Sequence, residues 1–449
     1  MRKGNRILSG LLALVMAAVM LLCPAAAISY EPDFTPTSKA VYLENLDTGL
    51  ILYEKNADEK MYPASLTKIM TAIVVLENVK DLDGETAEYP MWIQNMLYGT
   101  NASLGGLIVG EELTIRQLLT SALVQSGNES AMILAGYVGS GGMADFMPRD
   151  ITTFVEMMND KAKALGCTGT HFTNPTGLHS DNTYTTARDM AIMAKYAMQK
   201  SAFSSIVKNY AVQLGQTNKH ADLWQYSTNK MLLTSSPYYY APVVGIKTGS
   251  TDEAGRCVIS QAEDSGYHYF CVVMGSPVTA AEPYQNFIET RQLYRWAFGN
   301  FSLRTLLEQG ELMAEVPVKY SGDGKVAKLA IKEDVVQLLR DDISLDSIIY
   351  KAELPEFVEA PIAAGDTVGK MHIMLMGEEI GTVELVATQA FSLSWFRKAL
   401  GTIGSLLSST VAKVIFIVVV LAIAGYIVYA VRHNKKRKKH RSKYSDRNY

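Results

Sequence analysis

The stretch PASLTKIMTA, residues 63–72, places a serine and a lysine three positions apart where the sequence becomes helical. Side chains at i and i+3 of a helix project to the same side, so Ser65 and Lys68 are expected to lie together. A hydroxyl attacks a carbonyl only when a base removes its proton, and a lysine is such a base when burial or nearby positive charge lowers its pKa. The pair predicts a nucleophile with its base; the alternative is that Ser65 caps the helix.

Two further motifs follow in a fixed order. Ser126-Gly127-Asn128 ends an apolar helical run, and Lys247-Thr248-Gly249 begins a predicted strand where the glycine lets a substrate approach the backbone. The order Ser-x-x-Lys, Ser-x-Asn, Lys-Thr-Gly is the signature of penicillin-binding proteins and serine β-lactamases.

Each motif taken alone has little specificity. Ser205 and Lys208 also have the Ser-x-x-Lys spacing, and Ser-x-Asn recurs at residues 180–182 and 227–229. We interpret Ser205 and Lys208 as part of a surface helix, and only the Ser126 motif has the required order and spacing. Singly, Ser126 and Asn128 could satisfy a turn and Lys247 could be a solvated strand end.

The two ends of the chain predict membrane attachment. Residues 1–27 combine a basic start, an apolar run and a small-residue cleavage site, as in an export signal. Residues 414–431 carry no charge and are long enough to span a bilayer. Residues 432–449 are strongly basic, which predicts a cytoplasmic tail that contacts anionic lipids. The expected location is the cell membrane, single-pass, with the body on the extracytoplasmic side.

The region between these ends predicts two domains. Residues 28–300 place strands before and after a helical region, which predicts an α/β fold with an antiparallel sheet closed by its two ends. Residues 301–390 have short alternating runs with Gly and Pro turns, as in a small β sandwich. Residues 391–413 are predicted to form an amphipathic linker helix.

The 449-residue chain has a net charge of −3, and its basic ends leave an acidic body, which argues against nucleic acid as a partner.

Cysteine and histidine usage predicts neither a disulfide framework nor a metal site. Without the signal, Cys167, Cys257 and Cys271 remain, an odd number. Cys257 and Cys271 lie on two predicted strands of one hairpin, so they could face each other, or they could be buried free thiols. The seven histidines lack a metal-ligand spacing, and no cofactor is expected.

With these motifs, the chain resembles the low-molecular-mass penicillin-binding proteins that are serine-type D-alanyl-D-alanine carboxypeptidases, the peptidase S11 group. The resemblance includes FTNPTGLHSDNTYTTARDMA (residues 172–191), GIKTGSTDEAGRC (residues 245–257), the small β domain and a C-terminal anchor. It implies the penicillin-binding, β-lactamase-like transpeptidase fold. Many relatives use only an amphipathic helix as anchor, and relatives vary at Ser250, which bears on substrate preference.

The resemblance also implies a reaction at Ser65. This residue would attack the peptide bond between the last two D-alanines of a peptidoglycan stem, form an acyl-enzyme that water hydrolyses, and so limit cross-linking of the cell wall. Lys68 would deprotonate Ser65, Ser126 would relay the proton to the departing amine, and Asn128 would hold the substrate amide. β-Lactams, which mimic D-Ala-D-Ala, would acylate the same serine.

The remaining implied roles concern substrate binding. Lys247, with Thr248, would bind the C-terminal carboxylate of the substrate. The strand Lys247-Thr248-Gly249-Ser250 would line the cleft, and the N–H groups of Ser65 and Ser250 would form the oxyanion hole.

Three other functions compete with this interpretation. A D,D-endopeptidase shares every motif. A β-lactamase is a poorer match, since neither the Glu-x-x-x-Asn element nor a Tyr-x-Asn in the middle position occurs in the right place. A wall-binding scaffold protein would not require the catalytic set.

Overall fold

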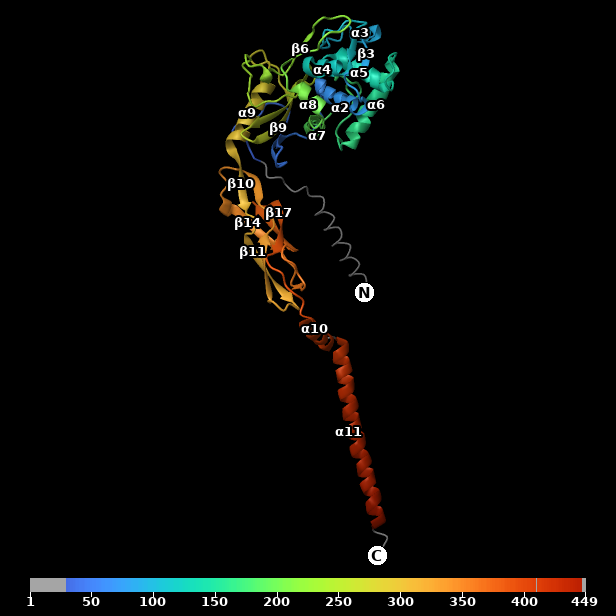
Figure 1. The fold of residues 1–449 in the computed structure, drawn as a ribbon, viewed down its shortest axis with the longest axis vertical. Helices are drawn as coiled ribbons and strands as arrows, with labels where there is room; N and C mark the ends of the chain where they lie inside the picture. The colour runs from blue at the N-terminus through green and yellow to red at the C-terminus, as the bar shows by residue number, and fades with distance from the viewer. Residues whose placement is uncertain (1–29, 409, 446–449) are drawn as a thin grey trace, which may run out of the picture. The chain divides into compact units, whose positions relative to one another are not determined.

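The computed structural model describes residues 30–408 and 410–445, and the chain forms two compact units (Figure 1). The first unit extends to Ser302 and includes Leu338–Ile343; the second comprises Leu303–Gln337 and the residues from Ser344 onward. The predicted signal sequence, residues 1–27, lies outside the described residues.

A five-stranded sheet is the centre of the first unit, and its strand order is β2-β1-β9-β8-β7. Every neighbouring pair is antiparallel. The first strand of the unit pairs with the last, with Ala40 opposite Met274, so the predicted closure of the sheet by its two ends is confirmed. The strands are β1 (Ala40–Asn45), β2 (Ile51–Lys55), β7 (Lys247–Thr251), β8 (Gly255–Asp264) and β9 (Tyr267–Ser276).

The sheet is covered on both faces, and the alternation of side chains along β1 shows how. Ala40 and Tyr42 belong to the core shared with the helical region, whereas Val41 and Leu43 belong to the core that contains α9. Successive side chains of a strand point to opposite faces, so a strand buried on both faces is apolar throughout. Strand β1 therefore lies between two separate cores.

The helices of this unit lie mainly between β2 and β7 in the sequence. Helix α2 is apolar on nearly every side and is buried in the helical core, as expected for a helix without a polar face. Helix α9 packs on β8 and β9. The helices are α2 (Lys68–Asn78), α3 (Met91–Leu97), α4 (Ile115–Thr120), α5 (Asn128–Gly139), α6 (Pro148–Ala164), α7 (Ala187–Met198), α8 (Ser201–Val207) and α9 (Gln285–Asn300).

Short elements complete the first unit. Two small antiparallel pairs are β3 (Thr86–Glu88) with β4 (Glu112–Thr114), and β5 (Ala211–Gln213) with β6 (Trp224–Tyr226). Two 3₁₀ turns, η1 (Ala64–Thr67) and η3 (Lys230–Leu232), contribute residues to the site described below. One π-helical turn, η2 (Ser121–Gln125), directly precedes Ser126.

The second unit is rich in β structure, as predicted. Its six-stranded sheet has the order β14-β16-β17-β12-β11-β15, and β10 pairs with β13 separately. The strands are β10 (Phe301–Leu307), β11 (Leu312–Lys319), β12 (Val326–Ile331), β13 (Val335–Arg340), β14 (Ile348–Glu353), β15 (Val358–Glu359), β16 (Thr367–Leu375) and β17 (Glu378–Ala387), with the 3₁₀ turn η4 (Leu345–Ser347).

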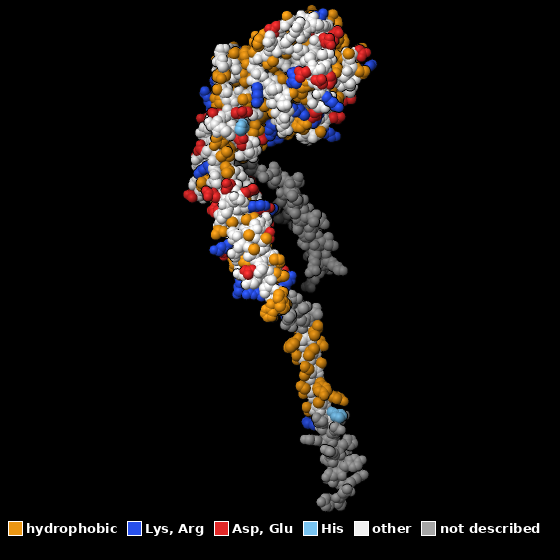
Figure 2. Space-filling model, viewed as in Figure 1, with side chains coloured by type: hydrophobic (Ala, Val, Ile, Leu, Met, Phe, Trp, Pro, Cys, Tyr) orange, Lys and Arg blue, Asp and Glu red, His pale blue; other side chains and the backbone are white. Residues whose placement is uncertain are grey.

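Two helices follow the second sheet, α10 (Trp395–Ser408) and α11 (Thr410–Ser445). Within α11, residues Lys413–His433 have a mean hydropathy of 2.9 and are not buried against the protein, so this helix is a candidate membrane span. Figure 2 shows the apolar surface of this stretch. The helix continues beyond Val431 into the basic run.

The three described cysteines are free and buried. Cys257 belongs to the core shared with the helices, and Cys271 to the core that contains α9. The register places Ser260, not Cys257, opposite Cys271. The suggestion that the two thiols face each other across the hairpin is therefore wrong, because they point to opposite faces of the sheet.

Candidate active site

Ser65 lies in the turn η1, directly before helix α2. The cap positions are Pro63 for η1 and Thr67 for α2, and neither helix start is capped by a side-chain hydrogen bond. The interpretation of Ser65 as a helix cap is therefore wrong. Its hydroxyl instead lies 3.0 Å from Lys68 Nζ, which is the predicted pairing.

Lys68 is completely buried, and its amine is held by three oxygen atoms. Lys68 Nζ lies 3.0 Å from Ser65 Oγ, 3.0 Å from Asn128 Oδ1 and 2.7 Å from the Thr176 carbonyl. Burial lowers the pKa of Lys68 well below 10.5, and the charge of Lys247 lowers it further. A neutral amine next to a serine hydroxyl can accept its proton.

The Ser126 motif lies at a break between two helical segments. Ser126 follows η2 in the left-handed region, with φ 65°, and Asn128 begins α5. A Cβ on Gly127 would lie 2.8 Å from Ser121 Oγ and 3.2 Å from Gly105 N, so a larger residue at this position would force its neighbours to shift. Asn128 Nδ2 donates to the Ser103 carbonyl (2.8 Å), which turns its Oδ1 toward Lys68.

The Lys-Thr-Gly motif forms β7, the edge strand that faces η1. Lys247 is 1% exposed and donates to Ser126 Oγ (3.0 Å) and to the Thr248 carbonyl (3.0 Å). Burial lowers its pKa to about 7. A Cβ on Gly249 would lie 2.9 Å from the Pro63 carbonyl oxygen and 3.1 Å from Ser65 N, so only glycine lets β7 pass this close.

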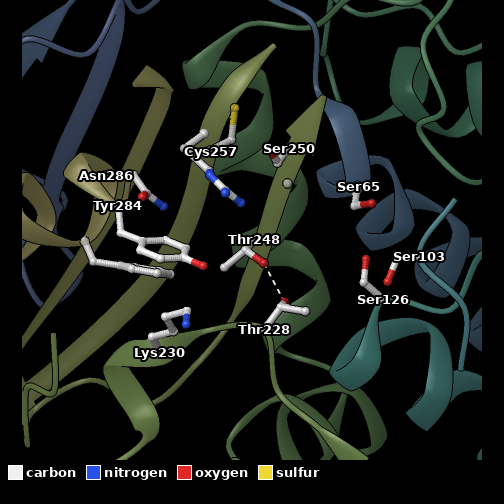
Figure 3. Close-up of a pocket in the computed structure, with 13 residues that line it drawn as sticks. Ser65, Ser103, Ser126, Thr228, Lys230, Thr248, Ser250, Cys257, Tyr284 and Asn286 are labelled. Atoms are coloured by element: carbon white, nitrogen blue, oxygen red, sulfur yellow. Dashed lines mark hydrogen bonds between the residues drawn. The ribbon is translucent and has the colours of Figure 1, made fainter. Parts of the chain in front are cut away.

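Two cavities meet at Ser65, and the exposed Ser250 lies at the rim of both. The first, of about 300 Å³, extends past Thr248, which lies in Figure 3 between the serines Ser65 and Ser126 and the group of Lys230, Tyr284 and Asn286. The second, of about 430 Å³, extends past Asn101, Ser103, Leu178, His179, Asp252 and Glu253. A substrate that reaches Ser65 thus has room on both sides of the bond to be cut.

The structure brings together all eight predicted site residues, and it adds several that the motifs did not indicate. Thr176, which contributes its carbonyl to Lys68, lies in the segment 172–191 on which the resemblance rests. Arg256 lines the first cavity and lies in the segment 245–257, which also carries the resemblance. Lys230, Tyr284 and Asn286 line the same cavity without any signal in the sequence.

The second Ser-x-x-Lys match and the Ser-x-Asn match at residues 227–229 lie in different places. Ser205 and Lys208 are exposed, as predicted for a surface helix. The match at residues 227–229 lies beside the site, where Thr228 and Thr248 are joined through their hydroxyls and Asn229 Nδ2 donates to the Gly245 carbonyl (3.1 Å). Within residues 30–408 and 410–445, no cluster of three His, Cys, Asp or Glu side chains has the geometry of a metal site.

The burial of Lys247 predicts a gain of stability when its charge is removed. Between its folded pKa of about 7 and the 10.5 of an ordinary lysine, the unfolded chain binds the extra proton. Burying the charged Lys247 amine therefore lowers the free energy of unfolding by its full amount below pH 7. This destabilisation disappears as the pH rises toward 10.5. We expect Lys247→Met to raise the free energy of unfolding at pH 7 by about 1–3 kcal/mol.

Thermal unfolding at pH 7 and pH 10 tests this expectation. The stability that Lys247→Met gains over the wild type should be smaller at pH 10 than at pH 7. Lys208→Met, at an exposed lysine, should change the stability little at either pH. A Lys247→Met protein less stable than the wild type at pH 7 would contradict the assignment of a destabilising buried charge.

The sequence profiles of two known families match this chain. The D-alanyl-D-alanine carboxypeptidase profile of peptidase S11 matches residues 27–278, and the profile of the C-terminal domain of penicillin-binding protein 5 matches residues 301–392. The D-alanyl-D-alanine carboxypeptidase DacF of Bacillus subtilis is 29% identical over 396 residues, which are 86% of this chain and 95% of DacF. The D-alanyl-D-alanine carboxypeptidase of Streptomyces sp. strain K15 is 33% identical over 272 residues, 59% of this chain and 88% of that protein.

Solved structures are similar over the same regions. The crystal structure of penicillin binding protein 5 from Haemophilus influenzae matches with a TM-score of 0.60 and 26% identity, covering 81% of this chain and all of that one. The structure of the Streptomyces K15 DD-transpeptidase matches with a TM-score of 0.54 and 30% identity, covering 60% of this chain and all of that one. Because the peptidase profile spans more than half of the sequence and includes all three motifs at the site, the chain belongs to the peptidase S11 family of D-alanyl-D-alanine carboxypeptidases.

Proposed function

We propose that Ser65 is the nucleophile of a serine-type D-alanyl-D-alanine carboxypeptidase and that Lys68 is its base. The observation that carries this proposal is the buried Lys68 amine with its lowered pKa, 3.0 Å from Ser65 Oγ. The substrate is the peptidoglycan stem peptide that ends in D-Ala-D-Ala, as the names of the relatives suggest.

In the acylation step, Lys68 takes the Ser65 proton while Oγ attacks the carbonyl of the penultimate D-alanine. The N–H groups of Ser65 and Ser250 stabilise the oxyanion. This placement is supported by β7, whose Gly249 leaves no room for a Cβ beside Ser65 N. Asn128 holds the substrate amide while its Oδ1 keeps Lys68 in place.

The leaving group needs a proton as the peptide bond breaks. Ser126 donates its own to the D-alanine nitrogen and takes another from Lys247, whose Nζ lies 3.0 Å from Ser126 Oγ. Lys247 and Thr248 also contribute to binding the C-terminal carboxylate. Lys68 then passes its proton to solvent, from which Lys247 is reprotonated. Water attacks the ester on Ser65 while the neutral Lys68 amine takes a proton from it, this proton returns to Ser65 Oγ as the ester breaks, and the shortened stem is released.

β-Lactams acylate Ser65 by the same route, since they mimic the D-Ala-D-Ala terminus. A second outcome of the acyl-enzyme is transfer to an amine, and the similar Streptomyces K15 structure is described as a DD-transpeptidase. Cleavage of cross-links by a D,D-endopeptidase would use the same residues. The three activities differ only in what occupies the two cavities.

The location follows from the two ends of the chain. We propose one C-terminal span within Lys413–His433, the catalytic unit outside the membrane, and the basic tail in the cytoplasm. Each Lys or Arg of the tail near an anionic lipid surface contributes about 1 kcal/mol.

The test uses the full-length protein in detergent, incubated with diacetyl-L-Lys-D-Ala-D-Ala and, separately, with a fluorescent penicillin. We expect release of free D-alanine and covalent labelling. Adding an amino-acid acceptor distinguishes transfer from hydrolysis, because a transpeptidase then forms a new peptide. Labelling without release of D-alanine would reject the carboxypeptidase in favour of an endopeptidase or β-lactamase.

A further inference from the structure

Glu129 is a buried carboxylate directly behind the Ser126 motif. It follows Asn128 in the first turn of α5 and is 1% exposed. A glutamate is rarely buried this completely unless a charge or hydrogen bonds compensate it. No step of the proposed reaction uses Glu129, so its burial beside the site calls for another role.

One oxygen of this carboxylate is bound by the loop that precedes α4. Glu129 Oε1 accepts from Gly105 N at 2.5 Å and lies 3.5 Å from Leu107 N. The Gly105 carbonyl is held from a second direction, because it accepts from Gln225 Nε2 (2.9 Å). Glu129 therefore fixes residues 103–107 to the start of α5.

The segment 103–107 carries the group that orients Asn128. The Ser103 carbonyl accepts from both the backbone N–H (2.9 Å) and the Nδ2 (2.8 Å) of Asn128. The remaining Asn128 Oδ1 lies 3.0 Å from Lys68 Nζ. A chain of contacts thus leads from Glu129, through Ser103 and Asn128, to the amine beside Ser65.

Glu129 also acts on the Lys68 amine through its charge. Burial lowers the pKa of Lys68 most, the charge of Lys247 lowers it further, and the charge of Glu129 raises it. Burial raises the pKa of Glu129 itself, whereas the N–H groups that bind it and the Lys68 charge lower it. Two amines buried in one site repel each other's charge, and a buried carboxylate offsets part of this repulsion. Lys68 is thereby a stronger base than the same amine would be without the carboxylate.

The second oxygen of the carboxylate, Glu129 Oε2, is buried and has no hydrogen-bond partner among the described residues. A buried acceptor without a donor destabilises the folded state. Holding the loop would not require this oxygen, because the Oε1 of a glutamine would accept from Gly105 N equally well. The destabilisation is understandable if the negative charge itself is needed.

We propose that Glu129 is a positioning residue of the active site: its negative charge balances the buried amines of Lys68 and Lys247, and its Oε1 holds the segment that orients Asn128. This inference rests on the proposed function, in which Lys68 is the base. Glu129 itself does not contact the substrate. Without its charge, Lys68 should be a weaker base that titrates at a lower pH.

The experiment measures the rate of acylation by a fluorescent penicillin between pH 5 and pH 10, on the full-length protein in detergent. Glu129→Gln keeps the shape and one acceptor, and the fall of the rate on the acid side should move about one pH unit lower. The maximal rate should fall about threefold to tenfold, because the amine is a weaker base. Burial and the charge of Glu129 raise the pKa of Tyr89 to about 12, so this phenol stays neutral over the measured range.

Glu129→Asp separates the charge from the contact with the loop. It keeps the negative charge, so its acid-side fall should lie within about 0.3 pH units of that of the wild type. Its shorter side chain reaches Gly105 less well and should lower the maximal rate. Gln225→Leu removes the other contact that holds Gly105 and changes no charge, so it should lower the maximal rate and leave the acid-side fall in place.

The matched control is Glu289→Gln. Glu289, in α9, is also 1% exposed and accepts from two backbone N–H groups, Thr37 N at 2.6 Å and Ser38 N at 3.2 Å. Its charge is not among those that shift the pKa of Lys68, so this variant should keep the wild-type pH dependence. Glu129→Ala also removes the charge of Glu129, and it keeps the inference testable if Glu129→Gln does not fold.

The outcomes separate this role of Glu129 from the proposed function. An acid-side fall that stays in place in Glu129→Gln, or that moves equally in Glu289→Gln, overturns the role of Glu129 while the carboxypeptidase stands. A shift that Glu129→Asp shows to the same extent overturns it as well, since the charge is then not the cause. A wild type that is not labelled, or whose rate does not fall at low pH, overturns the proposed function and this inference with it.

Discussion

The Ser65→Ala variant is expected to lose D-alanine release by at least about 10⁴-fold and to show no covalent labelling by penicillin. The reason is chemical, because the hydroxyl is the atom that forms the ester and no other hydroxyl lies next to the Lys68 amine among the described contacts. Labelling on a denaturing gel and an assay for free D-alanine measure the two effects.

The chain provides its own matched control for this change. Ser205 has the same spacing to Lys208 but is exposed, and its Oγ donates to the Ala202 carbonyl (3.0 Å). Ser205→Ala should keep both activities. The folded state of Ser65→Ala should also persist, since this serine caps no helix. Residual labelling of Ser65→Ala at the wild-type rate would show that a different residue is acylated.

The Lys68→Arg variant is expected to lose acylation by at least about 10³-fold, although it keeps the positive charge. Arginine cannot be deprotonated, so it cannot accept the Ser65 proton. Because burial and Lys247 lower the pKa of Lys68, wild-type acylation should rise with pH through a pKa below 10.5 and fall on the acid side. Rates of penicillin acylation measured between pH 5 and pH 10 test this pH dependence.

Two results would contradict the role of Lys68. One is acylation by Lys68→Arg within tenfold of the wild type. The other is a wild-type rate that does not fall as the pH is lowered while the protein remains folded. Lys208→Arg, at the exposed lysine of the second Ser-x-x-Lys match, should leave the rate and its pH dependence unchanged.

Much of the fold could be predicted because the decisive patterns are local. Strand runs before and after a helical region indicated a sheet closed by its two ends, and Ala40 indeed pairs with Met274. The spacing of Ser65 and Lys68 placed both on one side of a turn. The order of the three motifs selected Ser126 from three similar tripeptides, and its Oγ lies 3.0 Å from Lys247 Nζ.

What could not be predicted depends on contacts between distant segments. The Thr176 carbonyl that reaches Lys68 is a backbone group and leaves no mark in the sequence. Arg256 and Tyr284 reach one cavity only through the pairing of β7 with β8 and the start of α9. The sequence placed Cys257 and Cys271 on the two strands of one predicted hairpin. The register of these strands, which the sequence does not reveal, places the two side chains on opposite faces of the sheet.

The pairing of β1 with β9 also determines when the site can form. During synthesis, β1 and β2 must wait for their partner until nearly all of the first unit has emerged, because β9 is its last strand. The edge strand that carries Lys247 is attached to the sheet through β8, and β8 through β9. A chain that ends before Ser276 thus has Ser65 and Lys68 in a helical segment, but strand β7 is not yet held opposite them by the sheet. Such long-range closure is slow, and it delays the assembly of a reactive serine until the unit is complete.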